Sequence, residues 1–384
     1  MKRETGKYLI SGLSCEPVRA FMPDPLPPYP PLHIDLELQT LLDDALVSLG
    51  RLDSASIFLP NVSLFLYQYI RKEAILSSQI EGTQSSLSDL MLYELKENPG
   101  VPLDDVEEVS CYVSALMHGI ERIKDGFPIS LRLFKEIHAK LLSSGRGADK
   151  EPGQFRHSQN WIGGVRPGKA KFVPPPPHEL MNCLDSLEKF LNDLPHATPP
   201  IIKAGLAHVQ FETIHPFLDG NGRLGRLLIT LIFCASKTLQ EPLLYLSLYF
   251  KEHREEYYHL IQQVREVGDW ESWMSFFARA IKSTAQDAVK TALELNQLVA
   301  LDKEKVLSIP RKGPILLTIL NELSAYPIQT IKKIAEHTNL VPNTIASGLD
   351  FLIKLGIVKE MTGKKRGRLF IYQSYFDLLD RKSV

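Results

Sequence analysis

HPFLDGNGRLGR, residues 215–226, is the stretch that decides how this chain folds and what it binds. Gly220 and Gly222 permit backbone torsions closed to other residues and let peptide N–H groups approach an anion. The apolar segment that follows predicts a helix, whose N-terminal N–H groups and dipole would point at the same anion. Arg223 and Arg226, spaced i and i+3 on one helical face, add charge that can fork onto two phosphates. The stretch therefore predicts a polyphosphate site that suits a nucleoside triphosphate.

Two other side chains of this stretch suit phosphate chemistry. Asp219 offers one carboxylate, which is enough for Mg²⁺ when substrate phosphates and water supply the other ligands. His215 lies four residues earlier, and a histidine titrates near neutrality, so it can remove a proton from an attacking hydroxyl. His208, on the apolar helical segment upstream, is interpreted as a structural residue.

Two other motifs overlap the same glycines. Gly220-x-Gly222-x-x-Gly225 matches the dinucleotide-binding fingerprint, but the preceding segment 201–213 has helical spacing and no acidic residue lies near position 245. A calcium loop of the EF-hand type is also excluded, because the alternating oxygen ligands and the closing glutamate are absent.

Every specified position of residues 215–226 is filled for the signature His-Pro-Phe-x-Asp-Gly-Asn-Gly-Arg-x-x-Arg, so the chain resembles the Fic family. Two upstream segments, Gly153–Arg156 and Ile162–Pro177, resemble the strand-rich flap that precedes the Fic core. A third segment, Ser77–Gly82, resembles the family's inhibitory motif Ser/Thr-x-x-x-Glu-Gly/Asn, here N-terminal to the core.

The resemblance implies a protein adenylyltransferase that moves AMP from ATP to a Ser, Thr or Tyr hydroxyl of a protein. In that scheme His215 takes the hydroxyl proton and Asp219 holds Mg²⁺ across the α- and β-phosphates. Phe217 would anchor the loop in the core, Arg223 would contact the β-phosphate region, and Arg226 would align the γ-phosphate. The nucleotide site implied by the resemblance comprises Gly220, Asn221, Gly222, Arg223, Leu224, Gly225 and Arg226.

The inhibitory motif implies that the enzyme is restrained by default. Ser77 and Glu81 lie at the end of an apolar helical stretch, and Gly82 is a plausible stop for that helix. In the family this glutamate pairs with the second signature arginine, here Arg226. A carboxylate and a terminal phosphate compete for one guanidinium, so binding one excludes or misplaces the other.

Two further groups of residues are given binding roles. The resemblance implies that the flap pairs with an extended piece of the target protein. Tyr257 and Tyr258, on an amphipathic segment, are candidates for a wall of the adenine site, and the alternative is a place in the core. The predicted docking residues of the flap are Ile162, Gly163, Gly164 and Val173, and the predicted nucleotide residue is Tyr258.

The expected fold is mainly α, with four parts along the chain. Residues 1–102 open with a proline-rich arm at 22–32 and continue as helices that carry the inhibitory motif. Residues 103–284 form the helical Fic core with its small β-hairpin flap, and 285–308 form a helical connector.

The last part, residues 309–384, resembles a winged helix. It has helices at Gly313–Leu323, Ile328–Thr338 and Pro342–Leu355, strands at Ile357–Thr362 and Leu369–Tyr372, and the basic turn 363–368 as wing. Such a module binds DNA through Asn343 and Thr344 or else contacts protein. The predicted recognition helix Pro342–Leu355 has Lys354 as its one basic residue and also holds Asp350, so a modest DNA footprint is predicted.

Composition sets the remaining expectations. The 384 residues are 44% hydrophobic and carry 44 basic against 45 acidic residues, so no global attraction to nucleic acid or anionic lipid is expected. No apolar run reaches the length of a membrane span, and the N-terminus lacks a signal-peptide core. Cys15, Cys111, Cys183 and Cys234 lack the spacing of a zinc site or a disulfide scaffold. A cytoplasmic protein is predicted, and the resemblance implies modification of itself and a homodimer.

Several alternatives stay open at this stage. Phosphate cradles recognise charge and geometry, so another nucleotide can replace ATP as the donor. Glu81 can instead support hydrolytic removal of AMP from a modified protein. A DNA-binding regulator whose Fic core senses nucleotide is the remaining alternative, and the intact signature favours the enzyme.

Overall fold

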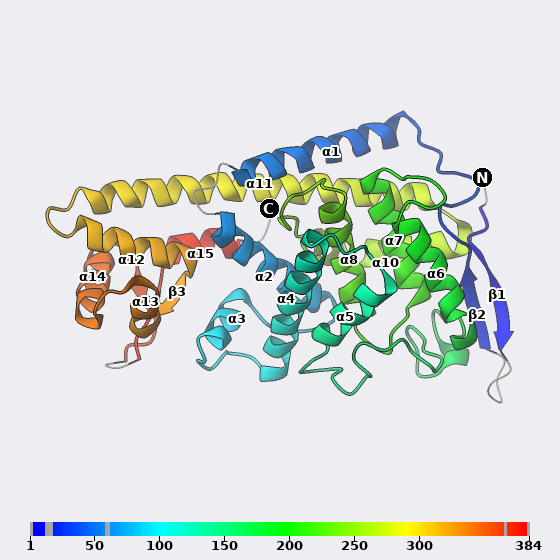
Figure 1. The fold of residues 1–384 in the computed structure, drawn as a ribbon, viewed down its shortest axis with the longest axis horizontal. Coiled ribbons are helices and arrows are strands. Elements are labelled where there is room, and N and C mark those ends of the chain that lie inside the picture. The colour runs from blue at the N-terminus through cyan, green and yellow to red at the C-terminus, as the bar shows by residue number, and fades with distance from the viewer. Residues whose placement is uncertain (1–2, 12–17, 58–61, 365–366, 382–384) are drawn as a thin grey trace.

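The protein is elongated and built almost entirely of helices (Figure 1). Its computed structural model describes residues 3–11, 18–57, 62–364 and 367–381. Within these residues the strands form only two small antiparallel sheets, one of two strands and one of three. The prediction of a mainly α fold is therefore confirmed.

A β-hairpin precedes the first helix, where only a proline-rich arm and helices were predicted. Strand β1 (Gly6–Ser11) pairs antiparallel with β2 (Val18–Pro23). Val18 and Ala20 of β2 are buried against Val173 of the flap region. The hairpin depends on this contact with a segment some 150 residues away, which local sequence patterns do not report.

Three helices complete the N-terminal region: α1 (Leu36–Ile57), α2 (Val62–Ile80) and α3 (Leu87–Glu94). Helix α1 lies alongside the long helix α11, as Figure 1 shows at the top of the molecule. Helix α2 packs between α4 and α9 of the core, so its C-terminal end reaches the signature loop. Helix α3 starts with a capping box, in which Ser86 and Asp89 each accept the other's backbone N–H.

The core helices surround a central pair, α7 and α8. Nearly every residue of both helices is buried, as expected for helices that are apolar on most sides. The loop between them carries the residues from His215 to Gly220. The core helices are α4 (Leu103–Lys124), α5 (Leu131–Leu141), α6 (Leu180–Leu191), α7 (Pro200–Ile214), α8 (Asn221–Ala235), α9 (Ser247–Glu252) and α10 (Arg254–Val267).

One continuous helix, α11 (Trp270–Leu307), joins the core to the C-terminal region. Its 38 residues span about 57 Å at 1.5 Å per residue. The core was predicted to end at residue 284 and the connector to begin at residue 285. Both positions lie inside α11, and buried residues continue along the helix past them. Neither α11 nor any other helix in the described part of the chain is long and apolar enough to cross a membrane.

The C-terminal region follows the predicted order of helices and strands, with one difference at its start. The segment predicted as a helix from Ile328 begins as a strand, because it pairs with β5 in a sheet of order β3-β5-β4. Lys365 and Arg366 of the predicted wing lie outside the described residues. The elements are α12 (Gly313–Ala325), β3 (Ile328–Thr330), α13 (Ile331–Thr338), α14 (Pro342–Lys354), β4 (Lys359–Glu360), β5 (Leu369–Ile371) and α15 (Gln373–Asp380).

Candidate active site

The loop between α7 and α8 has an unusual backbone at both ends. His215 ends α7 in the left-handed conformation (φ 50°, ψ 62°), and Gly220 precedes α8 with φ 75°. A left-handed residue other than glycine is uncommon and is held there only by its surroundings. The loop therefore turns sharply at the predicted base and again at the helix N-terminus that was predicted to bind phosphate.

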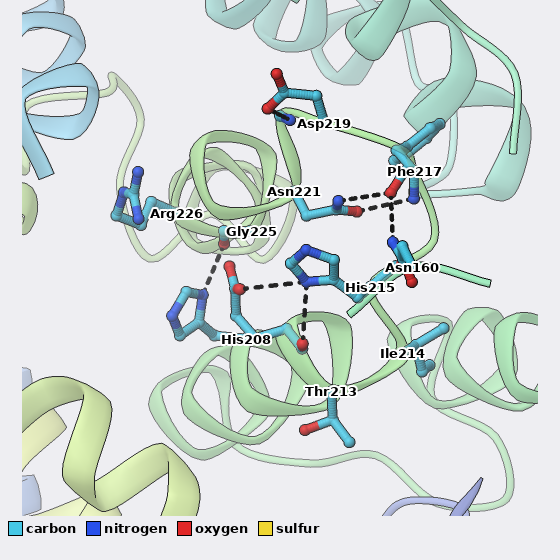
Figure 2. Close-up of polar contacts among 12 residues, drawn as sticks. Asn160, His208, Thr213, Ile214, His215, Phe217, Asp219, Asn221, Gly225 and Arg226 are labelled. Carbon is cyan, nitrogen blue, oxygen red and sulfur yellow. Dashed lines mark hydrogen bonds and ion pairs between the residues drawn. The ribbon is translucent and has the colours of Figure 1, made fainter. Parts of the chain in front are cut away.

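Asn221 closes this loop from inside. Its side-chain oxygen accepts the N–H of Phe217 at 2.9 Å, and its amide group donates to the Phe217 carbonyl at 2.8 Å (Figure 2). Phe217 is fully buried, which agrees with its predicted role as an anchor. Both polar atoms of the Asn221 side chain are thus bound within the loop. The predicted place of Asn221 in the phosphate cradle stays a prediction for its backbone N–H.

His138 of α5 binds the loop to the core through hydrogen bonds and a stacked ring. Nothing in the sequence predicted this role. Its Nδ1 accepts the N–H of Gly153 at 2.8 Å, so its Nε2 carries the proton and donates to the carbonyl of Asp219 at 3.0 Å. The ring also stacks on Phe217 at 3.7 Å between centroids. Burial lowers the pKa of His138 to about 4, which keeps this neutral tautomer.

Arg226 is buried and held by the inhibitory motif. Its Nη2 lies 2.8 Å from Glu81 Oε1 and donates to the carbonyl of Ser77 at 2.9 Å, and its Nε donates to the Ser77 hydroxyl at 2.9 Å. A Cβ added at Gly222 would lie 2.3 Å from Glu81 Oε1, so only glycine lets the carboxylate reach this place. Burial raises the pKa of Glu81, but Arg226 outweighs it and the net pKa is lowered, so the carboxylate is charged.

The C-terminal end of α2 is fixed from several directions. Arg254 donates to the carbonyl of Ile80 at 3.1 Å, and Arg146 donates to the carbonyl of Glu81 at 3.3 Å. Two turns earlier, the buried carboxyl of Glu73 accepts the Ser247 hydroxyl at 2.5 Å and its N–H at 3.1 Å. These contacts hold Glu81 against the signature loop.

Glu73 should make stability depend on pH. Burial raises its pKa from 4.5 to about 7, so the unfolded chain loses this proton first as pH rises. The contribution of the protonated Glu73 carboxyl to the free energy of unfolding is complete below pH 4.5 and is lost as the pH rises past about 7. Relative to Glu73→Gln, we expect the wild type to lose on the order of 2 kcal/mol of unfolding free energy over this range. Urea denaturation at both ends of the range measures it, and equal losses in the two proteins would contradict it.

Arg223 is buried beside a carboxylate that the sequence did not reveal. Its Nη1 lies 2.9 Å from Glu108 Oε1 in α4, and its Nη2 lies 3.6 Å from Asp219 Oδ1. Among the described residues, neither Nε nor Nη1 has a partner in hydrogen-bond geometry. Glu108 also binds Arg146, at 3.3 Å, which links the signature to the loop that contacts Glu81. Contact of Arg223 with the β-phosphate stays a prediction.

Three residues predicted to contact the nucleotide, or considered for it, face the core instead. Leu224 is buried among apolar residues, and the carbonyl of Gly225 accepts a hydrogen bond from His208 Nδ1 at 2.9 Å (Figure 2). Tyr257 is buried and its hydroxyl lies 2.8 Å from His208 Nε2. Leu224 and Gly225 lie in α8, which is buried on most sides, so both face neighbouring helices. Tyr258 is 42% exposed and stays a candidate.

The flap is a loop rather than a β-hairpin. Its pairing among the described residues is limited to one bridge between Ile162 and Phe172, and short 3₁₀ turns lie at Pro167–Lys169 and Pro177–Glu179. One backbone hydrogen bond connects the flap to β2, in which the N–H of Phe21 donates to the carbonyl of Val173 at 2.9 Å. Docking of a target through Val173 stays a prediction.

The flap is nevertheless bound to the loop of His215. The guanidinium Nε of Arg156 donates to the carbonyl of His215 at 2.9 Å, and Asn160 donates to the carbonyl of Phe217 at 2.9 Å (Figure 2). Target docking through Gly163 and Gly164 stays a prediction, and these contacts connect that segment directly to the predicted base.

The comparisons with known proteins agree with this geometry. The family model described as "Fic/DOC family N-terminal" matches residues 39–121, and that described as "Fic/DOC family" matches residues 128–233. The chain belongs to the Fic/DOC family. The second match covers the Fic signature and its flap, and the first covers the helix that carries Glu81.

Curated relatives of this Fic protein carry the name protein adenylyltransferase Fic. The relative from Drosophila grimshawi is 29% identical over 256 residues, which are 64% of this chain and 49% of the relative. The relative from Drosophila yakuba is 30% identical over 187 residues, 48% of this chain and 34% of the relative. The Fic protein therefore spans about half or less of the length of the relatives it matches.

Solved structures share the Fic fold. A Fic family protein from Desulfovibrio desulfuricans G20 is 17% identical, with a TM-score of 0.59 over 89% of this chain and 97% of that one. A fragment of Fic-1 from C. elegans is 24% identical, with a TM-score of 0.52 over 66% of this chain and 72% of that one. At these identities the likeness shows the fold alone.

Proposed function

We propose that this protein is an adenylyltransferase that moves AMP from ATP to a hydroxyl of a protein, and that Glu81 restrains it. The observation that carries the proposal is the buried Arg226, which the carboxylate of Glu81 binds at 2.8 Å beside the N-terminus of α8. A γ-phosphate on the same arginine would have to displace that carboxylate. The name of the curated relatives, protein adenylyltransferase Fic, supports transfer of AMP rather than its removal.

The surroundings of α8 support a phosphate ligand. The first turn of a helix has N–H groups without helical partners, and the helix dipole favours negative charge there. Nε of Arg223 is a buried donor without a partner among the described residues, whereas its Nη1 is ion-paired with Glu108 at 2.9 Å. A buried donor without a partner costs free energy unless a ligand satisfies it.

Asp219 is the residue proposed to hold Mg²⁺. Its side chain is 39% exposed at the mouth of the loop, and one oxygen accepts the N–H of Gly220 at 2.6 Å. No group of three or more His, Cys, Asp or Glu side chains suited to a metal occurs among the described residues. The single carboxylate fits an ion that also takes phosphate oxygens and water, and such an ion would neutralise the charge of the phosphates.

A covalent adduct tests the proposal. Purified wild type, Glu81→Gly and Glu81→Gly/His215→Ala are incubated with Mg²⁺ and ATP labelled at either the α- or the γ-phosphate, and intact mass is measured. We expect Glu81→Gly to gain the mass of AMP and the α-label only. Transfer of the γ-label would show a kinase, and absence of any adduct on the protein or on added candidate targets would overturn the proposal.

Three finer expectations accompany this function. Modification of the protein itself, a homodimer and a cytoplasmic location all stay predictions. The adduct experiment tests the first directly, because the protein is then its own target.

We also propose that residues 309–384 form a winged helix that binds duplex DNA. They carry 12 basic against 6 acidic residues, whereas residues 1–308 carry 32 against 39. Asn343, Ser347 and Lys354 are exposed along α14, and Asp350 on the same helix is paired with Arg368 at 3.1 Å. Pairing of that acid leaves a polar and basic face for the major groove.

DNA binding predicts a salt dependence. We expect Lys354→Ala and Lys364→Ala each to lower the slope of log affinity against log salt by about 1, because each removes one phosphate contact. Fluorescence anisotropy with a labelled duplex measures the slope. Lys189→Ala, an exposed lysine of α6 in the core, is the matched control and should leave the slope unchanged. Equal slopes in all variants would point to a protein partner instead.

A further inference from the structure

Beneath the signature loop lies a buried carboxylate with no assigned role, that of Glu212. It belongs to the last turn of α7, three residues before His215. Its residue is 7% exposed, and its Oε1 has no hydrogen-bond partner among the described residues. Burial of an ionisable oxygen without a partner is costly, so its place here calls for an explanation.

We propose that Glu212 is a positioning residue for His215, and that its oxygens hold the imidazole so that Nε2 faces the attacking hydroxyl. This inference rests on the proposed function, in which His215 is the general base. Nδ1 of His215 lies 3.4 Å from the backbone carbonyl oxygen of Glu212 and 4.0 Å from its carboxylate Oε2 (Figure 2). The carbonyl oxygen accepts, and the carboxylate accepts when it is charged, so the proton of the neutral ring then belongs on Nδ1 and the lone pair on Nε2.

The carboxylate also stabilises the positive charge that appears on the His215 imidazole during proton transfer. Burial lowers the pKa of His215 to about 3, and the nearby Arg265 and Arg156 lower it too. A base in such a place resists becoming a cation. When Nε2 takes the hydroxyl proton, a negative carboxylate facing Nδ1 stabilises the imidazolium, as the acidic member of a catalytic triad does.

Charged groups on several helices set the protonation of Glu212. Burial raises its pKa to about 7, Arg226 and Arg265 lower it, and Glu81 raises it. Tyr257 and Tyr258 of α10 also interact with it electrostatically, and the charge of Glu212 raises the pKa of each tyrosine. Glu81 is one of the charges that disfavour the carboxylate, so removal of Glu81 favours its charged form.

Neighbouring helices fix the geometry of Glu212. Nη2 of Arg265 donates to the Glu212 carbonyl at 3.0 Å, and Nε donates to the Thr213 hydroxyl at 3.0 Å. On the other side, a Cβ added at Gly225 would lie 2.5 Å from Glu212 Oε1. Gly225, at an unspecified position of the signature, therefore leaves room for this carboxylate beneath the loop.

The test uses the Glu81→Gly protein as parent and compares it with Glu212→Gln and Glu212→Asp added to it. The rate of AMP incorporation is measured against pH and against ATP concentration. We expect Glu212→Gln to lower the rate at saturating ATP at least about tenfold, with the KM for ATP unchanged. It should also remove the rise in rate with pH, which in this parent lies below pH 7 because Glu81 no longer raises the pKa of Glu212. Glu212→Asp, which keeps the charge, should recover part of the rate.

A second readout needs no activity. Nitrogen NMR of histidine-labelled protein shows which ring nitrogen of His215 carries the proton, with His215→Ala to assign the signal. We expect the proton on Nδ1 in the parent and a weakened preference in Glu212→Gln. If the parent transfers no AMP, the proposed function fails, and this measurement still decides whether Glu212 orients His215.

Glu266→Gln in the same parent is the control, because it makes the same chemical change at an exposed glutamate near the end of α10. It should leave the pH profile and the His215 tautomer unchanged. The proposal is overturned if His215 carries its proton on Nε2 in the parent. It is also overturned if Glu212→Gln matches the parent in rate and pH profile, or if its loss is only a loss of folded protein.

Discussion

Glu81→Gly is expected to increase the rate of AMP incorporation by about ten- to a hundredfold. The substitution removes the carboxylate that lies 2.8 Å from Arg226 Nη2 and leaves the guanidinium free for a terminal phosphate. Ser77 keeps its two hydrogen bonds to Arg226, so the arginine stays in place. Incorporation of α-labelled ATP by wild type and variant at equal protein concentration measures the gain.

A second substitution tells whether the gain acts through Arg226. Arg226→Ala added to Glu81→Gly should erase the increase, because the two residues act on one phosphate and their effects do not add. Glu266→Gly is the matched control, since Glu266 is an exposed glutamate near the end of another helix, α10. Equal rates of wild type and Glu81→Gly would remove Glu81 from the restraint.

His215→Ala in the Glu81→Gly protein should lower AMP incorporation by about a hundred- to ten-thousandfold. The imidazole is predicted to act on the hydroxyl and not on the phosphates, so the affinity for ATP should change little. Rates from labelled ATP and binding from titration calorimetry with a non-hydrolysable ATP analogue separate these two effects.

The control for histidine removal is His259→Ala, which changes an exposed histidine of α10. It should behave as its parent does in rate and in binding. Transfer that survives in His215→Ala would assign the base to another group, and loss of ATP binding together with activity would mean that His215 holds the loop rather than the proton.

Structural features that are built from neighbouring residues in the chain could be predicted from the local sequence. Residues 215–226 carry their own turn glycines, arginines and helix start, so the loop predicted to bind phosphate could be located from contiguous residues. The same holds for the C-terminal region, whose helices and strands follow the predicted order apart from β3. Strand β3 was predicted as the start of a helix. It could not be predicted from local sequence, because it forms only by pairing with β5.

The interior of the site could not be predicted in this way. His138, Glu108 and Glu212 lie outside the signature, and lone histidines and glutamates carry no pattern that distinguishes them from ordinary helix residues. Leu224 and Gly225 were placed in the nucleotide site because they belong to the motif, but the side chain of Leu224 is buried and the Gly225 carbonyl is bound to His208.

From its sequence alone, the chain could be assigned a mainly helical fold, a polyphosphate loop at His215 to Arg226 and a resemblance that singled out Glu81. Only the tertiary structure decided what these residues touch. It placed Glu81 on Arg226, 145 residues away, and committed Asn221 to its own loop. It also put Glu212 behind His215 with an unpaired oxygen. The reason is physical: torsions and caps depend on near neighbours, whereas burial, ion pairing and tautomer depend on which distant helices pack together.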